Sequence, residues 1–153
     1  MDYEAKLELL GFDLPETPAP GGNYVPAVRV GNLVYTAGTI CIKDGEMTHT
    51  GKVGEGQTVE SGYAGAQVCA LNLLAAIKGE AGSLNNLKRF LTVNGYVNAV
   101  AGFPESPRVI NGASDLFVSV FGERGKHARA AVAVAGLPRD STVEVQCVVE
   151  LEG

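Results

Sequence analysis

The 153-residue sequence contains no tryptophan, two histidines and three cysteines. The cysteines, Cys41, Cys69 and Cys147, are odd in number and widely spaced, and they form neither a C-x-x-C pair nor a zinc-ligand spacing. Such a pattern argues against a disulfide framework and gives no indication of a metal site. We therefore expect three reduced thiols, buried as small hydrophobic side chains in a cytoplasmic protein.

Long apolar runs and a surplus of basic residues are also missing. No run of about 18 apolar residues could span a membrane, and the acidic start of the chain lacks the apolar segment of a signal peptide. The formal net charge is −5, whereas a protein that follows a phosphate backbone carries a basic face. We therefore expect neither a membrane nor a nucleic acid among the partners. Only 19% of the residues are charged, which suits a chain that hides surface in an oligomer.

The length and the apolar fraction of 46% indicate one domain over residues 1–153, large enough for one core. The first residues of this domain, 1–19, are expected to form a short helix and a linker. In this segment, Asp2 can cap a short helix that Gly11 ends, and the Pro- and Gly-rich residues 13–23 indicate an extended linker.

Hydrophobic periodicity predicts two main helices and about five or six strands. The helices cover residues 58–81 and 107–121, each with a one-sided apolar stripe. The predicted strands include 24–30, 33–36 and 90–97, and Gly31-Asn32 indicates a hairpin between the first two. This order predicts an α+β fold, in which both helices cover one face of a mostly antiparallel sheet and the other face is left bare.

Residues 127–151 read as two further strands joined by a turn over Gly136–Thr142. Alternation buries Val143 and its period-two partners, so that Glu144 points the other way. In the first of these strands, Arg129 and Ala131 share a face that is otherwise small and uncharged. We expect Arg129, Ala131 and Glu144 on the bare sheet face, which another subunit would cover.

Arg129 and Glu144 allow two interpretations. One is a buried ion pair that links adjacent strands across a hairpin, which is a common structural device. The other is a site in which Arg129 binds a substrate carboxylate with two parallel hydrogen bonds and Glu144 positions or activates water.

The other candidate side chains also have two interpretations each. Tyr24 is either an aromatic residue that caps the core at a strand end or a phenol that orients a ligand. His127 is either a solvated loop side chain or a proton donor near neutral pH. His49 has no expected role, and Arg108 and Arg139 are expected to be surface charges.

Segments from across residues 20–151 resemble the reactive-intermediate deaminase (Rid) family, which is also labelled endoribonuclease L-PSP-like. The similar segments occur in order and at matching separations: Gly22–Val25 with Val30–Gly38, Val109–Asn111, Ala128–Arg129, and Leu137–Pro138 with Val143–Val145. The resemblance implies a chorismate-mutase-like fold that assembles into a trimeric barrel, with three clefts at the subunit interfaces.

The same resemblance implies an activity without metal or other cofactor, the hydrolysis of reactive enamines or imines to 2-keto acids and ammonia. It assigns the substrate carboxylate to Arg129, the placement of imine and water to Tyr24 and Glu144, and a close backbone approach to Gly38. Ala131 and His127 would also lie at the substrate.

Four departures resemble a longer, less characterised branch of about 150 residues. Ala131 stands where the deaminases commonly have Cys, Thr39 replaces a frequent Gln, His127 replaces Phe or Pro, and the 1–19 extension is added. The alternative function is therefore a non-catalytic homotrimer that binds small carboxylates or regulates a partner. RNA cleavage, a label that some relatives carry, fits poorly with the acidic charge.

Overall fold

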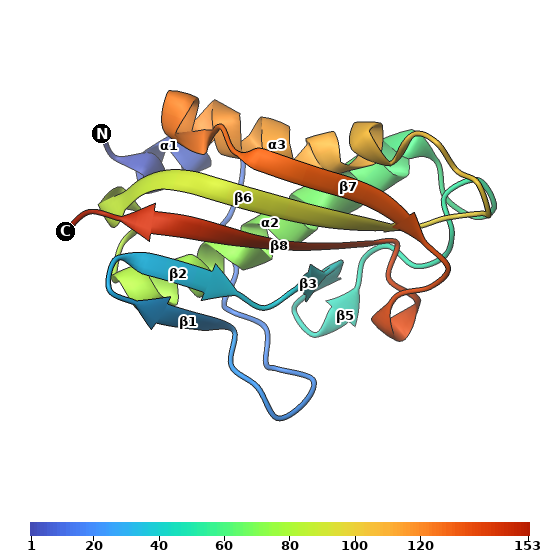
Figure 1. Ribbon diagram of the computed structural model, residues 1–153, viewed down its shortest axis with the longest axis horizontal. Coiled ribbons are helices and arrows are strands. Elements are labelled where there is room, and N and C mark those ends of the chain that lie inside the picture. The colour runs from blue at the N-terminus through green and yellow to red at the C-terminus, as the bar shows by residue number, and fades with distance from the viewer.

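A twisted sheet forms one layer of the protein and two long helices form the other, in a computed structural model that describes all 153 residues (Figure 1). The sheet has six strands in the order β1-β2-β8-β6-β7, and β3 pairs with β8 beside β2. The strands of the sheet are β1 (Ala27–Val30), β2 (Leu33–Thr36), β3 (Thr39–Ile40), β6 (Leu87–Asn98), β7 (Ala128–Val134) and β8 (Val143–Leu151). A separate two-stranded sheet contains β4 (Ile42–Lys43) and β5 (Glu46–Met47).

The helices begin and end where the sequence predicts. Helix α2 (Val59–Ala81) starts after the Thr58 cap, whose side chain accepts from the backbone of Ser61, and α3 (Ser106–Phe121) has proline in its first turn. The short α1 (Tyr3–Leu9) is capped by Asp2. Three 3-10 turns complete the helical elements: η1 (Leu84–Asn86), η2 (Gly122–Gly125) and η3 (Pro138–Asp140). The α+β prediction, with both main helices on one face, is confirmed.

The core lies between the helices and the sheet. Strand β8 alternates strictly, with Val143, Val145 and Cys147 among its buried positions, and a cluster of 31 buried residues fills the space between the two layers. All three cysteines are buried and unpaired by disulfides, as predicted. None of the helices has the length and apolar character needed to cross a membrane.

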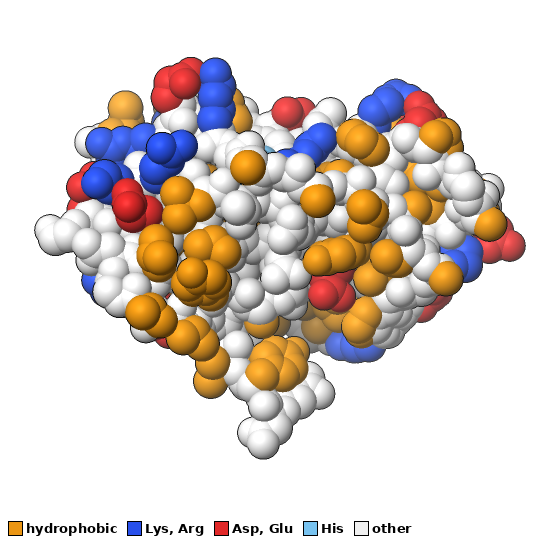
Figure 2. Space-filling model, in the orientation of Figure 1, with side chains coloured by type: hydrophobic (Ala, Val, Ile, Leu, Met, Phe, Trp, Pro, Cys, Tyr) orange, Lys and Arg blue, Asp and Glu red, His pale blue; other side chains and the backbone are white.

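The opposite sheet face is open and carries large apolar side chains. Figure 2 shows apolar groups gathered over the strands on this side. The exposed fractions of Val28, Val30, Tyr35 and Val132 are 50%, 63%, 47% and 46%. An apolar sheet face of this kind is typical of a surface that another chain covers.

Two sequence-based predictions about the strands are wrong. Strands β7 and β8 do not form a hairpin, because β6 lies between them and pairs with β7 in parallel and with β8 antiparallel. Helix α3 connects β6 to β7 as a crossover, and period-two alternation is the same for parallel and antiparallel strands. The first strand begins at Ala27, so that Tyr24 lies in the preceding bend.

Candidate functional site

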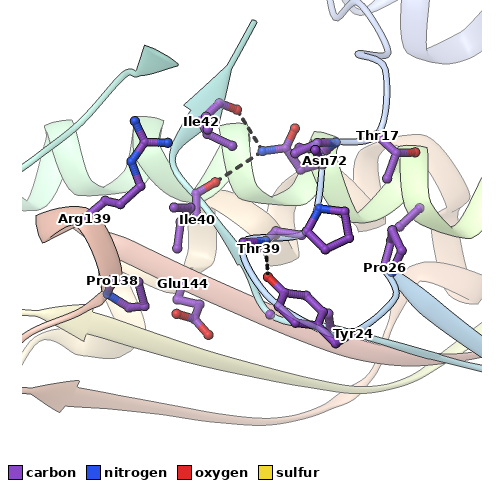
Figure 3. A pocket seen from close by; sticks show the side chains of 17 residues that line it. Thr17, Tyr24, Pro26, Thr39, Ile40, Ile42, Asn72, Pro138, Arg139 and Glu144 are labelled. Atoms are coloured by element: carbon purple, nitrogen blue, oxygen red, sulfur yellow. Dashed lines mark hydrogen bonds between the residues drawn. The ribbon is translucent and has the colours of Figure 1, made fainter. Parts of the chain in front are cut away.

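The candidate site residues form two groups on different sides of the sheet. The first group surrounds a cavity of about 510 Å³ (Figure 3). Its walls come from the N-terminal linker, the stretch between β2 and β4, helix α2 and the start of β8. The cavity contains Tyr24, Gly38 and Glu144 from the predicted set, and also Asn72, Ala76 and Arg139.

Glu144 belongs to the cavity because it lies on the open face of β8. Its carboxylate makes no hydrogen bond or ion pair within the chain and lies against Gly38, where an added Cβ would collide with it. The glycine therefore allows the close approach that the sequence predicted. Burial raises the pKa of the Glu144 carboxyl. A carboxyl group with a raised pKa is suited to exchanging protons with a bound ligand.

Tyr24 enters the cavity from the linker. Its phenol oxygen accepts a hydrogen bond of 3.1 Å from the backbone N–H of Gly21 (Figure 3), and the side chain is 53% exposed. Because the oxygen already accepts from the backbone, its own O–H is left to donate toward a ligand.

The second group surrounds Arg129, at the sheet edge formed by β7. Its guanidinium donates to Asn111 Oδ1 at 2.8 Å, to Ser114 Oγ at 3.1 Å and to the carbonyl of Pro107 at 3.4 Å. All three acceptors are neutral and belong to α3, and no carboxylate forms an ion pair with Arg129. The guanidinium is therefore held in place while its positive charge is left uncompensated.

His127 is linked to Arg129 through Ser114. Its Nδ1 is 2.7 Å from the carbonyl of Gly125, so Nδ1 carries the proton, and its Nε2 is 2.8 Å from Ser114 Oγ. Burial lowers the pKa of the His127 imidazole, the hydrogen bond to Gly125 opposes this effect, and the charge of Arg129 adds to it. A neutral His127 thus accepts from the Ser114 hydroxyl, and Ser114 Oγ accepts from Arg129. His127 is therefore not a solvated loop side chain, because both of its ring nitrogens have partners within the chain.

The predicted placement of Arg129 and Ala131 on the bare sheet face is wrong. Arg129 donates hydrogen bonds to α3 and Ala131 packs against the core, so both side chains point to the helix side of the sheet. Glu144 points to the open side. Alternation predicts which residues share a face, but the packing of the helices decides which face that is.

An ion pair between Arg129 and Glu144 is also absent from the chain. Arg129 is level with Val93 of β6, which is level with Cys147 of β8. Two strand spacings and three residues along β8 separate the two Cα atoms by about 14 Å. The interpretation as a structural pair across a hairpin is therefore wrong.

Sequence reasoning missed four polar residues beside the predicted ones. Asn111 and Ser114 hold Arg129, and their i, i+3 spacing on an otherwise apolar helix stripe is a signal that could have indicated a shared partner. Asn72 and Arg139 line the Glu144 cavity. Arg139 was expected to be a surface charge, and it is exposed, yet it lies at the rim of this cavity beside Ile40 (Figure 3). No group of three His, Cys, Asp or Glu side chains could hold a metal ion.

Residues 4–151 match the family described as "YjgF/chorismate_mutase-like, putative endoribonuclease". The chain belongs to this family. Its resemblance to the Rid and L-PSP-like proteins is thereby confirmed. The chain is 43% identical over 148 residues to protein TCP17 of Trypanosoma cruzi, which covers 96% of this chain and 92% of that protein.

A second relative carries an enzyme name. The 2-iminobutanoate/2-iminopropanoate deaminase of Dermatophagoides farinae is 28% identical over 138 residues, covering 90% of this chain and 93% of that protein. Among solved structures, the protein Atu1372 from Agrobacterium tumefaciens superposes with a TM-score of 0.90 at 41% identity, covering 99% of this chain and 92% of that one. These similarities extend over nearly the whole chain, including the N-terminal helix in the case of Atu1372.

Proposed function

We propose that this YjgF/chorismate mutase-like protein hydrolyses reactive 2-imino acids, or the enamines that tautomerise to them, to 2-keto acids and ammonia. The observation that carries the proposal is the state of Arg129. A guanidinium that is fixed by three neutral acceptors, with no carboxylate partner, is prepared to bind a carboxylate with two parallel hydrogen bonds.

The site is completed by a second copy of the chain. Arg129 and Glu144 lie about 14 Å apart and on opposite sheet faces within one subunit, so a small imino acid cannot contact both. The apolar open face, with Val28, Val30 and Tyr35 exposed, supports assembly, and a homotrimer is the arrangement implied by the family resemblance. In that trimer, the β7 edge of one subunit supplies Arg129 and the cavity of its neighbour supplies Tyr24, Gly38 and Glu144.

The chemistry follows from these groups. Arg129 binds the carboxylate, and the Tyr24 hydroxyl donates to the substrate to orient it. The imine reacts in its N-protonated form, and the ionised Glu144 removes a proton from water as the water oxygen bonds to the iminium carbon. In the resulting tetrahedral amine alcohol, the C–N bond breaks as the proton held by Glu144 passes to the leaving nitrogen, and the hydroxyl proton is released to water as the C=O bond forms. The products are ammonia and a 2-keto acid, so that atoms and charge balance.

The D. farinae relative, a 2-iminobutanoate/2-iminopropanoate deaminase, supports this class of reaction. The rival function is a trimer that binds small carboxylates without turning them over. Ala131 favours the rival only if catalysis needs the thiol that many deaminases have there. The proposed proton transfer uses Glu144 and water, so it requires no group from the side chain at position 131, and Ala131 packs against the core of its own subunit.

The test is the release of ammonia and pyruvate from 2-aminoacrylate generated in solution, with wild type and Arg129→Ala compared. We expect acceleration by wild type and a loss of at least about 100-fold in kcat/KM in the variant, because a desolvated charged hydrogen-bond pair contributes several kcal/mol. Arg129→Lys is the matched control: it keeps the charge but not the paired geometry, so an intermediate loss is expected.

Three outcomes separate the alternatives. Acceleration that Arg129→Ala abolishes supports the deaminase. No acceleration, together with thermal stabilisation by 2-keto acids that depends on Arg129, favours the binding protein. A monomer in light scattering at micromolar concentration would contradict the shared site.

A further inference from the structure

The Glu144 cavity is larger than a small imino acid requires. A cavity of about 510 Å³ falls in the range that holds drug-sized ligands, whereas 2-iminopropanoate has only about six non-hydrogen atoms. Besides Tyr24, Gly38 and Glu144, the lining includes residues 17–21 of the N-terminal linker and Asn72 and Ala76 of α2. We call this end of the cavity the linker pocket; Thr17, Pro18, Ile42, Asn72 and Ala76 line it (Figure 3).

Asn72 gives the linker pocket a chemical preference. The side chain is only 1% exposed, and its Nδ2 donates to the carbonyls of Ile40 at 3.2 Å and Ile42 at 2.9 Å (Figure 3). These two acceptors settle the orientation of the amide, because a flipped amide would place its oxygen against two carbonyl oxygens. Its Oδ1 therefore faces away from both carbonyls and makes no hydrogen bond within the chain.

No fully buried side-chain nitrogen or oxygen of the protein lacks a hydrogen-bond partner, so Asn72 Oδ1, which has none within the chain, retains accessible surface where Asn72 lines the cavity. Asn is also a poor helix former in the middle of α2, so local helix propensity does not explain its presence there. A ligand that brings an N–H or O–H into the linker pocket can donate to this oxygen. A ligand carboxylate would instead meet Oδ1 as a second acceptor and be disfavoured.

The residues around Asn72 limit the size of the ligand group that can reach its Oδ1. Ala76 follows Asn72 by one helical turn and lies on the same face, and its small side chain leaves room beside the amide. Ile42 and Pro18 supply apolar walls. The linker closes the end, so the extension over residues 1–19 acquires a role as one side of the pocket.

We infer that the linker pocket selects imino acids with a side chain of several atoms that ends in an uncharged hydrogen-bond donor, which Asn72 Oδ1 accepts. This inference rests on the proposed function and names the substrate class of the same site. The reacting carbon lies at one end of the cavity, beside Glu144, Gly38 and Tyr24. At the other end, Asn72 recognises the substrate side chain by accepting its hydrogen bond.

The experiment compares three imines made in solution by an amino-acid oxidase from L-alanine, L-norvaline and L-homoserine. The norvaline and homoserine imines have the same number of non-hydrogen atoms and differ in a terminal methyl or hydroxyl. The rate at which the protein removes each imine is measured against trapping by semicarbazide. We expect kcat/KM for the homoserine imine to exceed that for the norvaline imine by about tenfold, the upper end of what one net hydrogen bond between neutral groups contributes.

Three variants test which residue makes the distinction. Asn72→Leu should bring the homoserine-to-norvaline ratio to one or below, whereas Gln67→Leu, the same kind of change on α2 outside the cavity, should keep the wild-type ratio. Ala76→Leu should fill the pocket and lower the rates for both larger imines relative to the alanine imine. Since Asn72→Leu also removes two hydrogen bonds, thermal unfolding is measured in parallel, and Ala76→Leu tests the pocket if Asn72→Leu does not fold.

The failures of the two proposals are distinguishable. Hydrolysis of the alanine imine with no preference for the homoserine imine would overturn the linker pocket and leave the deaminase intact. If no imine is hydrolysed, the deaminase fails, and binding of 2-oxo-4-hydroxybutanoate against 2-oxopentanoate is measured by calorimetry. Tighter binding of the hydroxy acid that Asn72→Leu removes would support the pocket, and equal binding would overturn it.

Discussion

The Arg129 group and the Glu144 cavity differ in how their polar atoms are satisfied. Arg129, Ser114 and His127 form a connected set of hydrogen bonds within the chain. In the cavity, the Glu144 carboxylate and Asn72 Oδ1 have no such partners. Hydrogen bonds that are already made fix the position of a group, whereas groups without partners retain their capacity to bind a ligand. In the proposed function, Arg129 is therefore a rigid anchor for the substrate carboxylate, and the cavity is where we expect proton transfer and selection.

Among changes that test the difference between the two groups, Glu144→Gln is expected to have the largest effect on activity. Glutamine keeps the shape but cannot take a proton from water, so kcat should fall by about 10²–10³-fold while KM changes little. Steady-state kinetics at pH 8 measure both values. A kcat within threefold of wild type would remove Glu144 from proton transfer and leave it as a wall of the cavity.

A smaller effect is expected from Asn111→Asp, which tests whether the neutral acceptors matter because they leave the charge of Arg129 uncompensated. The new carboxylate would pair with Arg129 and compensate its charge, so KM for imino acids should rise about tenfold with kcat nearly unchanged. Asn111→Ala is the control, since it removes one hydrogen bond but leaves the charge free. Equal KM values for Asn111→Asp and wild type would show that the uncompensated charge is not what binds the carboxylate.

The smallest effect is a dependence of stability on pH. Burial raises the pKa of Glu144 in the folded protein, so folding disfavours the ionised form. Relative to Glu144→Gln, wild type should be most stable below the unfolded pKa near 4.5 and should lose stability as pH rises through the folded pKa. Because Glu144 is only half-buried, the change in Tm should be less than the about 2–4 °C that 1 kcal/mol produces in a domain of this size.

Thermal melting of both proteins between pH 4 and pH 8 measures this difference, and groups shared by the two proteins cancel. A difference in Tm that grows in favour of wild type as pH rises would mean that the cavity stabilises the ionised carboxylate. In that case, a ligand would not be needed to satisfy Glu144, and the contrast with the Arg129 group would disappear.

Local sequence patterns predicted the helices and strands well, but they did not predict which strands pair with each other. The cap at Asp2 and the one-sided apolar stripes predicted α1, α2 and α3, because these signals depend on residues about one turn apart. The pairing of β7 with β6 rather than β8 depends on the crossover through α3, which no period-two pattern records. The sequence did not indicate a role for Asn72. One amide in a helix with an apolar stripe becomes a candidate only when the structure shows that β3 and β4 lie against it.

The sequence by itself determined the main helices and most strands, the α+β class, the family and the identity of Arg129, Tyr24, Gly38 and Glu144 as candidates. Only the tertiary structure decided that Arg129 and Glu144 lie on opposite sheet faces, that neutral acceptors hold Arg129, and that the linker and Asn72 extend the cavity. The physical reason is that helices and strands form from interactions between residues close in the chain. The environment of a charged or polar side chain is instead set by segments that meet only when the sheet and helices pack together.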